Sequence, residues 1–252
     1  MKKLILILVA ALGLSVSVGV CAQEGGVPWD KAPDKTQDVK ALQHGAALFA
    51  NYCMGCHSAS FMHYSDLQKL GLSEQQIKNN LMFATDKIGD MMKTNMAPAQ
   101  AKAWFGVVPP DLTLIARSRA VEGHSGADYL YNYLRGFYRD ETKPTGWNNT
   151  VFPGVAMPNV LWELQGERHL KHVETQQGGQ KVATAQFEQI TPGTVTPAKF
   201  DDDVADLVAF LQWMGDPAYE TRVHLGIWVL LFLAVCIFLT WRLNKAYWKE
   251  IK

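Results

Sequence analysis

The sequence has little cysteine: 4 residues in a chain of 252, of which only Cys53 and Cys56 stand close together. A structural zinc site usually needs a second pair of thiolate or imidazole ligands, and no second C-x-x-C is present. The chain also lacks a glycine-rich phosphate loop, a serine-protease-like pattern and an internal repeat. These absences give no support to nucleotide chemistry, triad hydrolysis or a repeat architecture.

Charge is missing from two long apolar stretches, one at each end of the chain. Residues 1–22 combine a basic start, an apolar run and a small-residue exit at Ala22. This order predicts a secretory signal peptide and a mature chain that starts near Gln23. An uncleaved anchor is the alternative, whereas a lipoprotein signal through Cys21 is disfavoured because Val20 is not a small residue.

The second uncharged stretch, Leu225–Trp241, is 17 residues long. It is long enough for a transmembrane helix, and we expect a span of about 224–242 within an anchor segment 219–252. A basic tail follows it: Arg242, Lys245, Lys249 and Lys252. The positive-inside rule then places the C-terminus in the cytoplasm and residues 23–218 outside. A buried helix of a soluble protein would not explain the tail.

The formal net charge of zero conceals an acidic exported region. Residues 23–223 hold 18 basic and 23 acidic side chains, a net charge of −5. Such a domain would attract basic partners and not nucleic acid, although the same excess could serve solubility alone.

Apolar periodicity predicts a mainly α-helical domain with long loops. A helix from Asp38 would bury Leu42, Ala46, Phe49 and Cys53. Ser73 with Gln76 resembles a capping box that opens a helix toward Phe83. Helices are also expected over Ala127–Arg139, with Tyr129, Tyr133 and Phe137 aligned, and over Val204–Met214, with one face formed by Val204, Leu207, Val208, Leu211 and Met214. Turn formers make Lys143–Asn159 a long loop, and residues 165–199 fit one or two short β hairpins. The acidic triplet Asp201–Asp203 is interpreted as the cap of the helix over Val204–Met214.

Cys53-Met54-Gly55-Cys56-His57 is the pattern that carries chemistry. In C-x-x-C-H two thiols add to the vinyl groups of one porphyrin and the histidine reaches its iron, which predicts a covalently bound haem c. The alternatives are a thioredoxin-like redox pair and half of a zinc site. A redox pair would usually accompany a βαβ pattern, which is absent here.

With His57 as one axial ligand, a second must come from elsewhere in the chain. The candidates are Met91, Met92, Met96, Met157 and several histidines, including His124. We favour Met157 because it lies in a turn-rich loop whose prolines stiffen the backbone, with Met96 as the runner-up. A bis-histidine iron through His124 is the less favoured alternative.

Further motifs run in order along nearly all of the mature chain. They are Gly45 and Phe49 before the haem motif, Val108-Pro109-Pro110-Asp111-Leu112-Thr113 with Arg117, Asp128-Tyr129, Phe152-Pro153-Gly154, Ala156-Met157-Pro158, Phe210-Leu211-x-Trp213 and the C-terminal anchor. In these the chain resembles the cytochrome c1 family, the haem-bearing subunit of quinol–cytochrome c reductase (the bc1 complex). The Pro-Pro-Asp-Leu segment is more specific than the haem motif alone.

The resemblance implies a cytochrome c-type haem domain with a minor β hairpin and one transmembrane helix. It implies one haem c on Cys53 and Cys56, with His57 and Met157 as axial ligands, Arg117 paired with a haem propionate, and Pro109 and Pro110 shaping the pocket wall. The chain departs from many relatives in lacking a second proline soon after Met157, which affects only the expected shape of that loop.

The function implied is that of an electron carrier and not of an enzyme by itself. Electrons would pass from a Rieske iron–sulfur protein to a soluble or membrane-bound cytochrome c, beside cytochrome b and membrane lipid, in a dimeric, proton-translocating complex. The expected location is a bacterial inner membrane with the haem domain in the periplasm. The alternatives are a free-standing tethered cytochrome c and a thiol–disulfide oxidoreductase.

Overall fold

The computed structural model describes residues 27–177 and 180–250. The predicted signal peptide, Cys21 included, lies outside the described residues. The chain divides into two compact units, one of Met1–Pro28 with Lys171–Gln186 and one of Trp29–Leu170 with Phe187–Lys252. The second unit contains every residue predicted to bind the haem.

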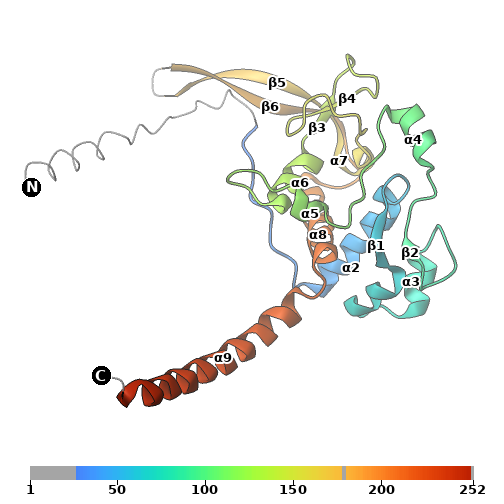
Figure 1. Cartoon of the computed structure of the whole chain (residues 1–252). Helices are drawn as coiled ribbons and strands as arrows, with labels where there is room; N and C mark the ends of the chain where they lie inside the picture. Colours follow the sequence, from blue (N-terminus) through green and yellow to red (C-terminus); the bar gives the residue numbers. More distant parts are fainter. Residues whose placement is uncertain (1–26, 178–179, 251–252) are drawn as a thin grey trace, which may run out of the picture. The chain divides into compact units, whose positions relative to one another are not determined.

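About half of the chain is helical, and the strands are few (Figure 1). The helices are α2 (Val39–Leu48), a π-helix η1 (Phe49–Cys53), 3-10 helix η2 (Tyr64–Leu70), α3 (Glu74–Asn80), α4 (Pro98–Phe105), α5 (Ile115–Ser118), α6 (Gly126–Arg135), α7 (Trp162–Gln165), α8 (Pro197–Gly215), α9 (Tyr219–Tyr247) and 3-10 helix η3 (Trp248–Glu250). The strands among the described residues form three pairs: β1 (Ala59–His63) with β2 (Met91–Met92), β3 (Phe137–Arg139) with β4 (Trp147–Asn149), and β5 (Gly166–Gln177) with β6 (Gln180–Pro192).

The core of the second unit is built around α8, which packs against α2, α5 and α6 (Figure 1). The predicted apolar face of α8 is confirmed, because Val204, Leu207, Val208, Leu211 and Met214 are all buried. The crossing with α2 is close at Gly45, where a Cβ atom would lie 2.2 Å from the backbone oxygen of Asp206. Only glycine fits this crossing.

The helix that leads into the haem motif forms as predicted. Asp38 caps α2, since its side chain accepts hydrogen bonds from the backbone N–H groups of Lys40 and Ala41. The expected apolar face is buried: Leu42, Ala46, Phe49 and Cys53. The final turn widens into the π-helix η1, which ends at Cys53. The helix therefore delivers the first cysteine into the core.

Two predicted helices end earlier than expected. The Ser73–Gln76 capping box that opens α3 is confirmed, but the helix stops at Asn80 and not at Phe83. Helix α6 stops at Arg135, because Phe137–Arg139 pairs with Trp147–Asn149 as antiparallel strands. Strand pairing thus replaces the last expected turn of α6 and places β4 inside the predicted loop.

The prediction that Asp201–Asp203 cap the helix expected over Val204–Met214 is wrong. Helix α8 begins at Pro197, and its cap is Thr196, whose hydroxyl accepts from the Lys199 N–H. Proline at the first helical position has no N–H to leave unsatisfied, so it favours this earlier start. The acidic triplet lies one turn into the helix and forms ion pairs with lysine and arginine side chains.

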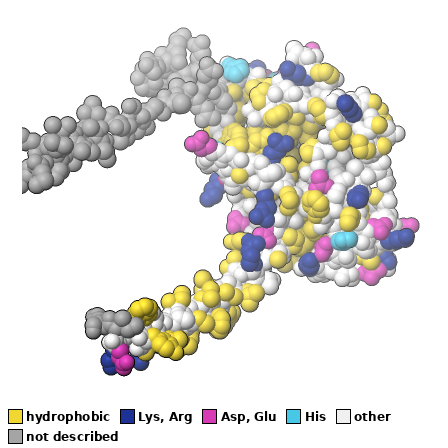
Figure 2. All heavy atoms as spheres, in the orientation of Figure 1, with side chains coloured by type: hydrophobic (Ala, Val, Ile, Leu, Met, Phe, Trp, Pro, Cys, Tyr) yellow, Lys and Arg dark blue, Asp and Glu magenta, His cyan; other side chains and the backbone are white. Residues whose placement is uncertain are grey.

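Two further predictions concern the C-terminal half. Residues 165–199 contain a β hairpin, β5–β6, as expected, but its strands of 12 and 13 residues are longer than the short hairpins that the turn signals predicted. Helix α9 is long and apolar enough to cross a membrane, with a mean hydropathy of 2.5 over its most apolar window and none of that window buried. Figure 2 shows hydrophobic side chains along α9 with basic ones near its C-terminal end. Cys236 lies within this helix.

Candidate haem site

The two cysteines and the histidine of the motif lie on one tight turn at the end of η1. The backbone N–H groups of Cys56 and His57 both donate to the carbonyl oxygen of Cys53, at 3.1 and 2.9 Å. Cys53 is buried, whereas Cys56 and His57 are half-buried. The turn therefore presents two thiols and an imidazole from a single rigid segment.

The tautomer of His57 follows from its hydrogen bond. Its Nδ1 lies 2.7 Å from the carbonyl oxygen of Pro110. A carbonyl oxygen can only accept, so Nδ1 carries the proton and Nε2 keeps its lone pair. Burial lowers the pKa of His57, which favours the neutral imidazole that a metal needs. This donor set fits a haem iron.

The Pro-Pro-Asp-Leu segment lies directly against the residues that follow the motif. Its Leu112 N–H donates to the carbonyl oxygen of Ser58 at 2.8 Å, and its Asp111 carboxylate accepts from the Ser60 N–H at 2.7 Å. Sequence reasoning named Pro110 but not its contact with His57, and it named Asp111 as part of the motif without giving its side chain a role. The signal for Asp111 was present in the sequence, because Asp-x-Thr favours a turn in which the side chain accepts from the backbone.

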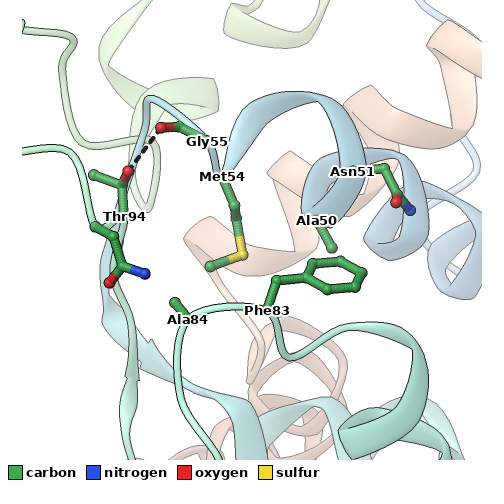
Figure 3. Close-up of a pocket in the computed structure, with 8 residues that line it drawn as sticks. Ala50, Asn51, Met54, Gly55, Phe83, Ala84 and Thr94 are labelled. Carbon is green, nitrogen blue, oxygen red and sulfur yellow. Dashed lines mark hydrogen bonds between the residues drawn. The ribbon is translucent and has the colours of Figure 1, made fainter.

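A second segment supports the motif from the loop between β2 and α4. Thr94 donates its hydroxyl to the Gly55 carbonyl oxygen at 2.9 Å, and its N–H donates to the Ser58 hydroxyl at 3.0 Å. Beside these contacts lies a hollow of about 340 Å³, which Figure 3 shows together with the Met54 and Phe83 side chains. Its lining is largely apolar: Ala50, Asn51, Met54, Gly55, Phe83, Ala84, Thr94 and Asn95.

Met157 lies in the loop between β4 and α7, where an aromatic side chain holds its sulfur. The Tyr133 hydroxyl donates to Met157 Sδ at 3.5 Å. Burial raises the pKa of Tyr133, so the hydroxyl stays protonated as a donor. Tyr133 itself stacks on Tyr129 and meets Phe137 edge to face. Sequence reasoning aligned these three rings on one face but did not connect Tyr133 with Met157.

The other candidate axial ligands differ in their surroundings. Met92 is fully buried in the main core, which identifies it as a packing residue, and Met91 is exposed in β2. The His124 ring packs against Trp29, with ring centroids 4.7 Å apart. Met96 is half-buried, and its N–H donates to the Thr94 hydroxyl.

Arg117 lies in α5 next to α8. Its Nη1 donates to the Gly215 carbonyl oxygen at 3.4 Å. Within residues 27–177 and 180–250 it forms no ion pair, and its side chain is exposed. Its remaining donors are therefore available for an anionic group, which is what a propionate partner needs.

The surroundings of the two thiol groups differ from those of a redox-active pair. Burial raises the pKa of Cys53 to about 12, and burial also raises the pKa of Cys56. Thiol–disulfide oxidoreductases need a lowered thiol pKa, because the thiolate is the nucleophile. The environment thus disfavours the thiol–disulfide interpretation of this pair.

A cluster of His44, Asp203 and Asp206 brings three possible metal ligands together. However, Lys35 Nζ lies 2.7 Å from Asp206 and Lys199 Nζ lies 2.5 Å from Asp203. The His44 ring also lies 2.8 Å from Asp206. Ammonium groups already neutralise both carboxylates, so the cluster is an ion-pair network that joins α2 to α8.

Two cysteines and a histidine with a free Nε2 on one turn are the arrangement of a c-type cytochrome, and α9 is long and apolar enough to anchor such a protein in a membrane. Residues 29–251 match the model of the Cytochrome C1 family, so the chain belongs to that family. Over its full length the chain is 38% identical to cytochrome c1 of Allochromatium vinosum, covering 100% of both chains.

Two other relatives carry different names. The chain is 44% identical over 225 residues to a Nitrosomonas europaea protein named ammonia monooxygenase gamma subunit, with 89% of each chain covered. It is 26% identical over 256 residues to cytochrome b/c1 of Bradyrhizobium diazoefficiens, covering 84% of this chain and 34% of that protein.

Family membership fixes the cofactor and the general role. The chain carries one covalently bound haem c, and it is an electron-carrier subunit of a bc1 complex rather than an enzyme by itself. Its single candidate membrane helix among the described residues fits a single-pass protein of the inner membrane.

Proposed function

We propose that this chain takes electrons from a Rieske iron–sulfur protein and passes them through its haem to a soluble cytochrome c. It acts beside cytochrome b in a dimeric quinol–cytochrome c reductase. The observation that carries the proposal is the His57–Pro110 hydrogen bond, which leaves Nε2 ready to bind iron on the same turn as both cysteines. The relative named cytochrome b/c1 supports the pairing with cytochrome b.

The proposed site assigns each residue a task. Cys53 and Cys56 hold the haem as thioethers, His57 and Met157 bind the two axial positions, and Arg117 pairs with a propionate. Pro109 and Pro110 form part of the pocket wall, and Pro110 also orients the histidine. The bound haem supplies one-electron chemistry. The protein then needs to keep both axial positions filled so that no external ligand enters.

Electron exit requires that part of the cofactor lies near the protein surface. Gly55, between the two attachment cysteines, is exposed and borders the hollow of Figure 3. Phe83 on the same hollow is 63% exposed. An acidic exported domain with an exposed apolar rim at the attachment turn suits a basic electron acceptor.

The proposed topology follows from the two ends of the chain. The signal sequence exports residues 23–218 to the periplasm, and α9 crosses the membrane to a cytoplasmic C-terminus. The basic residues that follow the apolar part of α9 support this direction, and Lys245 lies 5.5 Å from the Trp241 ring, a pairing typical of an interface.

Purification of the tagged chain from detergent-solubilised membranes tests the assembly. We expect cytochrome b and an iron–sulfur subunit to co-purify, with quinol-dependent reduction of soluble cytochrome c in the preparation. Co-purification with monooxygenase subunits in their place would favour the role in the name of the Nitrosomonas europaea relative. Recovery of the haem protein alone would favour a free-standing tethered cytochrome.

A further inference from the structure

The same local turn occurs three times in the sequence, as Asp-x-Thr at Asp34–Thr36, Asp111–Thr113 and Asp140–Thr142. In each turn one carboxylate oxygen accepts from both the N–H and the hydroxyl of the threonine. At Asp111 these distances are 2.9 and 2.6 Å, and at Asp140 they are 3.0 and 2.6 Å. The turn alone therefore does not distinguish Asp111.

The second carboxylate oxygen does distinguish it. Asp140 Oδ2 accepts from Asn148 at 2.9 Å, within the same β3–β4 hairpin. Asp111 Oδ2 instead accepts from the backbone N–H of Ser60 at 2.7 Å, across 51 positions of sequence. Ser60 follows His57 by three residues. Asp111 thus joins its own turn to the backbone that carries the proximal histidine.

Asp111 lies directly next to the acceptor of the histidine proton. The Pro110 carbonyl precedes it and accepts from His57, and the Leu112 N–H that follows it donates to Ser58. The Thr113 hydroxyl also accepts from the Phe61 N–H at 3.3 Å. Removing the Asp111 contacts would leave the backbone between Pro110 and Leu112 less restrained. The Pro110 carbonyl could then move away from His57 Nδ1.

The carboxylate is also charged at neutral pH. Burial alone would raise the pKa of Asp111, but hydrogen bonds from Thr113 and Ser60 outweigh it and hold the pKa below its usual value. A fixed negative charge near an iron ligand favours the more positive, oxidised iron. A carbonyl held on Nδ1 acts in the same direction, because it makes the imidazole a stronger donor.

We propose that Asp111 is a positioning residue that holds the Pro110 carbonyl on His57 and thereby lowers the reduction potential of the haem. The inference rests on the proposed role of His57 as axial ligand. It predicts that weakening the Asp111 contacts shifts the equilibrium toward reduced haem.

The test is a redox titration of the intact, membrane-purified complex carrying Asp111→Asn, Thr113→Val or Asp140→Asn. The Asp111→Asn variant loses the charge and can accept at only one oxygen, so we expect about a tenfold rise in the ratio of reduced to oxidised haem at a fixed ambient potential, or about 59 mV for one electron. Thr113→Val keeps the charge and removes the hydroxyl that donates to Asp111 and accepts from the Phe61 N–H, so the shift should be smaller and in the same direction. Asp140→Asn keeps the wild-type potential.

A wild-type potential in Asp111→Asn with an unchanged haem spectrum overturns the inference. A shift in Asp111→Asn without any shift in Thr113→Val assigns the effect to charge alone and overturns the positioning role. If Asp111→Asn retains no haem, the Thr113→Val titration decides, because that variant keeps the carboxylate. Failure of the proposed function looks different: the wild-type chain would then lack a low-spin c-type spectrum.

Discussion

At the scale of single residues, the Tyr133 hydroxyl donates to the Met157 sulfur at 3.5 Å. Met157→Ala should leave an open iron position, because alanine offers no ligand atom. We expect the reduced protein to bind carbon monoxide and its reduction potential to fall, both followed by optical titration. Loss of the soft sulfur ligand removes the preference for reduced iron.

Met96→Ala is the matched control for this prediction, since Met96 is the alternative ligand. It should leave the spectrum unchanged and carbon monoxide excluded. The reverse pattern, with Met96→Ala open and Met157→Ala closed, would move the ligand to Met96. If neither variant binds carbon monoxide, the second axial ligand would be His124.

Asp128 at the start of α6 allows a pH-dependent prediction. It accepts from the Ala32 N–H at 2.7 Å and from the N–H and hydroxyl of Ser125 at 2.9 and 2.7 Å. Burial would raise its pKa, but these hydrogen bonds outweigh it and lower the pKa below the usual value. The stabilisation is therefore present above the ordinary aspartate pKa and is lost as pH falls through the lowered one.

We expect Asp128→Asn to reduce the free energy of unfolding by about 2 kcal/mol at neutral pH, the usual worth of charged hydrogen bonds. The difference from wild type should shrink as pH falls from neutral through the lowered pKa of Asp128. Unfolding midpoints of the haem-loaded protein across this pH range measure it. A difference that is constant with pH would show that the carboxylate charge is not the cause.

At the scale of secondary-structure elements, the α2–α8 crossing depends on one missing side chain. A Cβ at Gly45 would lie 2.2 Å from the Asp206 oxygen and 2.7 Å from the Phe210 Cβ. Gly45→Ala should therefore separate the helices and destabilise the domain by about 3 kcal/mol, the upper range for overpacking. Because α2 delivers Cys53, haem incorporation should fall as well.

Gly89→Ala is the control for the crossing, since nothing lies within 4 Å of a Cβ at Gly89. It should unfold at nearly the wild-type temperature and stain for haem normally. Equal stability of the two variants would show that α2 and α8 tolerate a wider crossing.

Secondary structure was predictable where local patterns decide it. The α2 face, the α3 capping box and the α8 face are read from spacing within one helix. The end of α6 was not, because Phe137–Arg139 keeps helical spacing and changes to strand only when paired with Trp147–Asn149. A pairing partner farther along the chain is not part of that spacing.

The candidate haem site, like the secondary structure, was predictable only where local patterns decide it. The motif and the resemblance supplied Cys53, Cys56, His57 and Pro110 by name. They did not supply the His57–Pro110 or Ser60–Asp111 bonds, which join positions more than 50 residues apart. Tyr133 was predicted only as part of an apolar face, because apolar periodicity depends on its ring and does not indicate which group its hydroxyl contacts. Such contacts arise only from the tertiary fold.

At the scale of the whole molecule, charge should govern the encounter with the electron acceptor. Residues 23–223, which we propose are exported, carry a net charge of −5. The second-order rate of reduction of a basic soluble cytochrome c should fall several-fold between about 0.01 and 0.15 M salt, as screening shortens the range of attraction. A neutral small-molecule acceptor should show no such dependence. A flat profile with the basic cytochrome would assign the acidic excess to solubility.

The proposed haem attachment, through thioethers to Cys53 and Cys56 with His57 as ligand, underlies every other role proposed for this chain. The most direct measurement is the pyridine–haem spectrum, with haem quantified per polypeptide, of the chain recovered from denaturing electrophoresis. We expect one haem per chain with a c-type spectrum, and its loss from a Cys53→Ala, Cys56→Ala double variant. A chain without haem after denaturation, or a double variant that keeps its haem, would contradict this attachment.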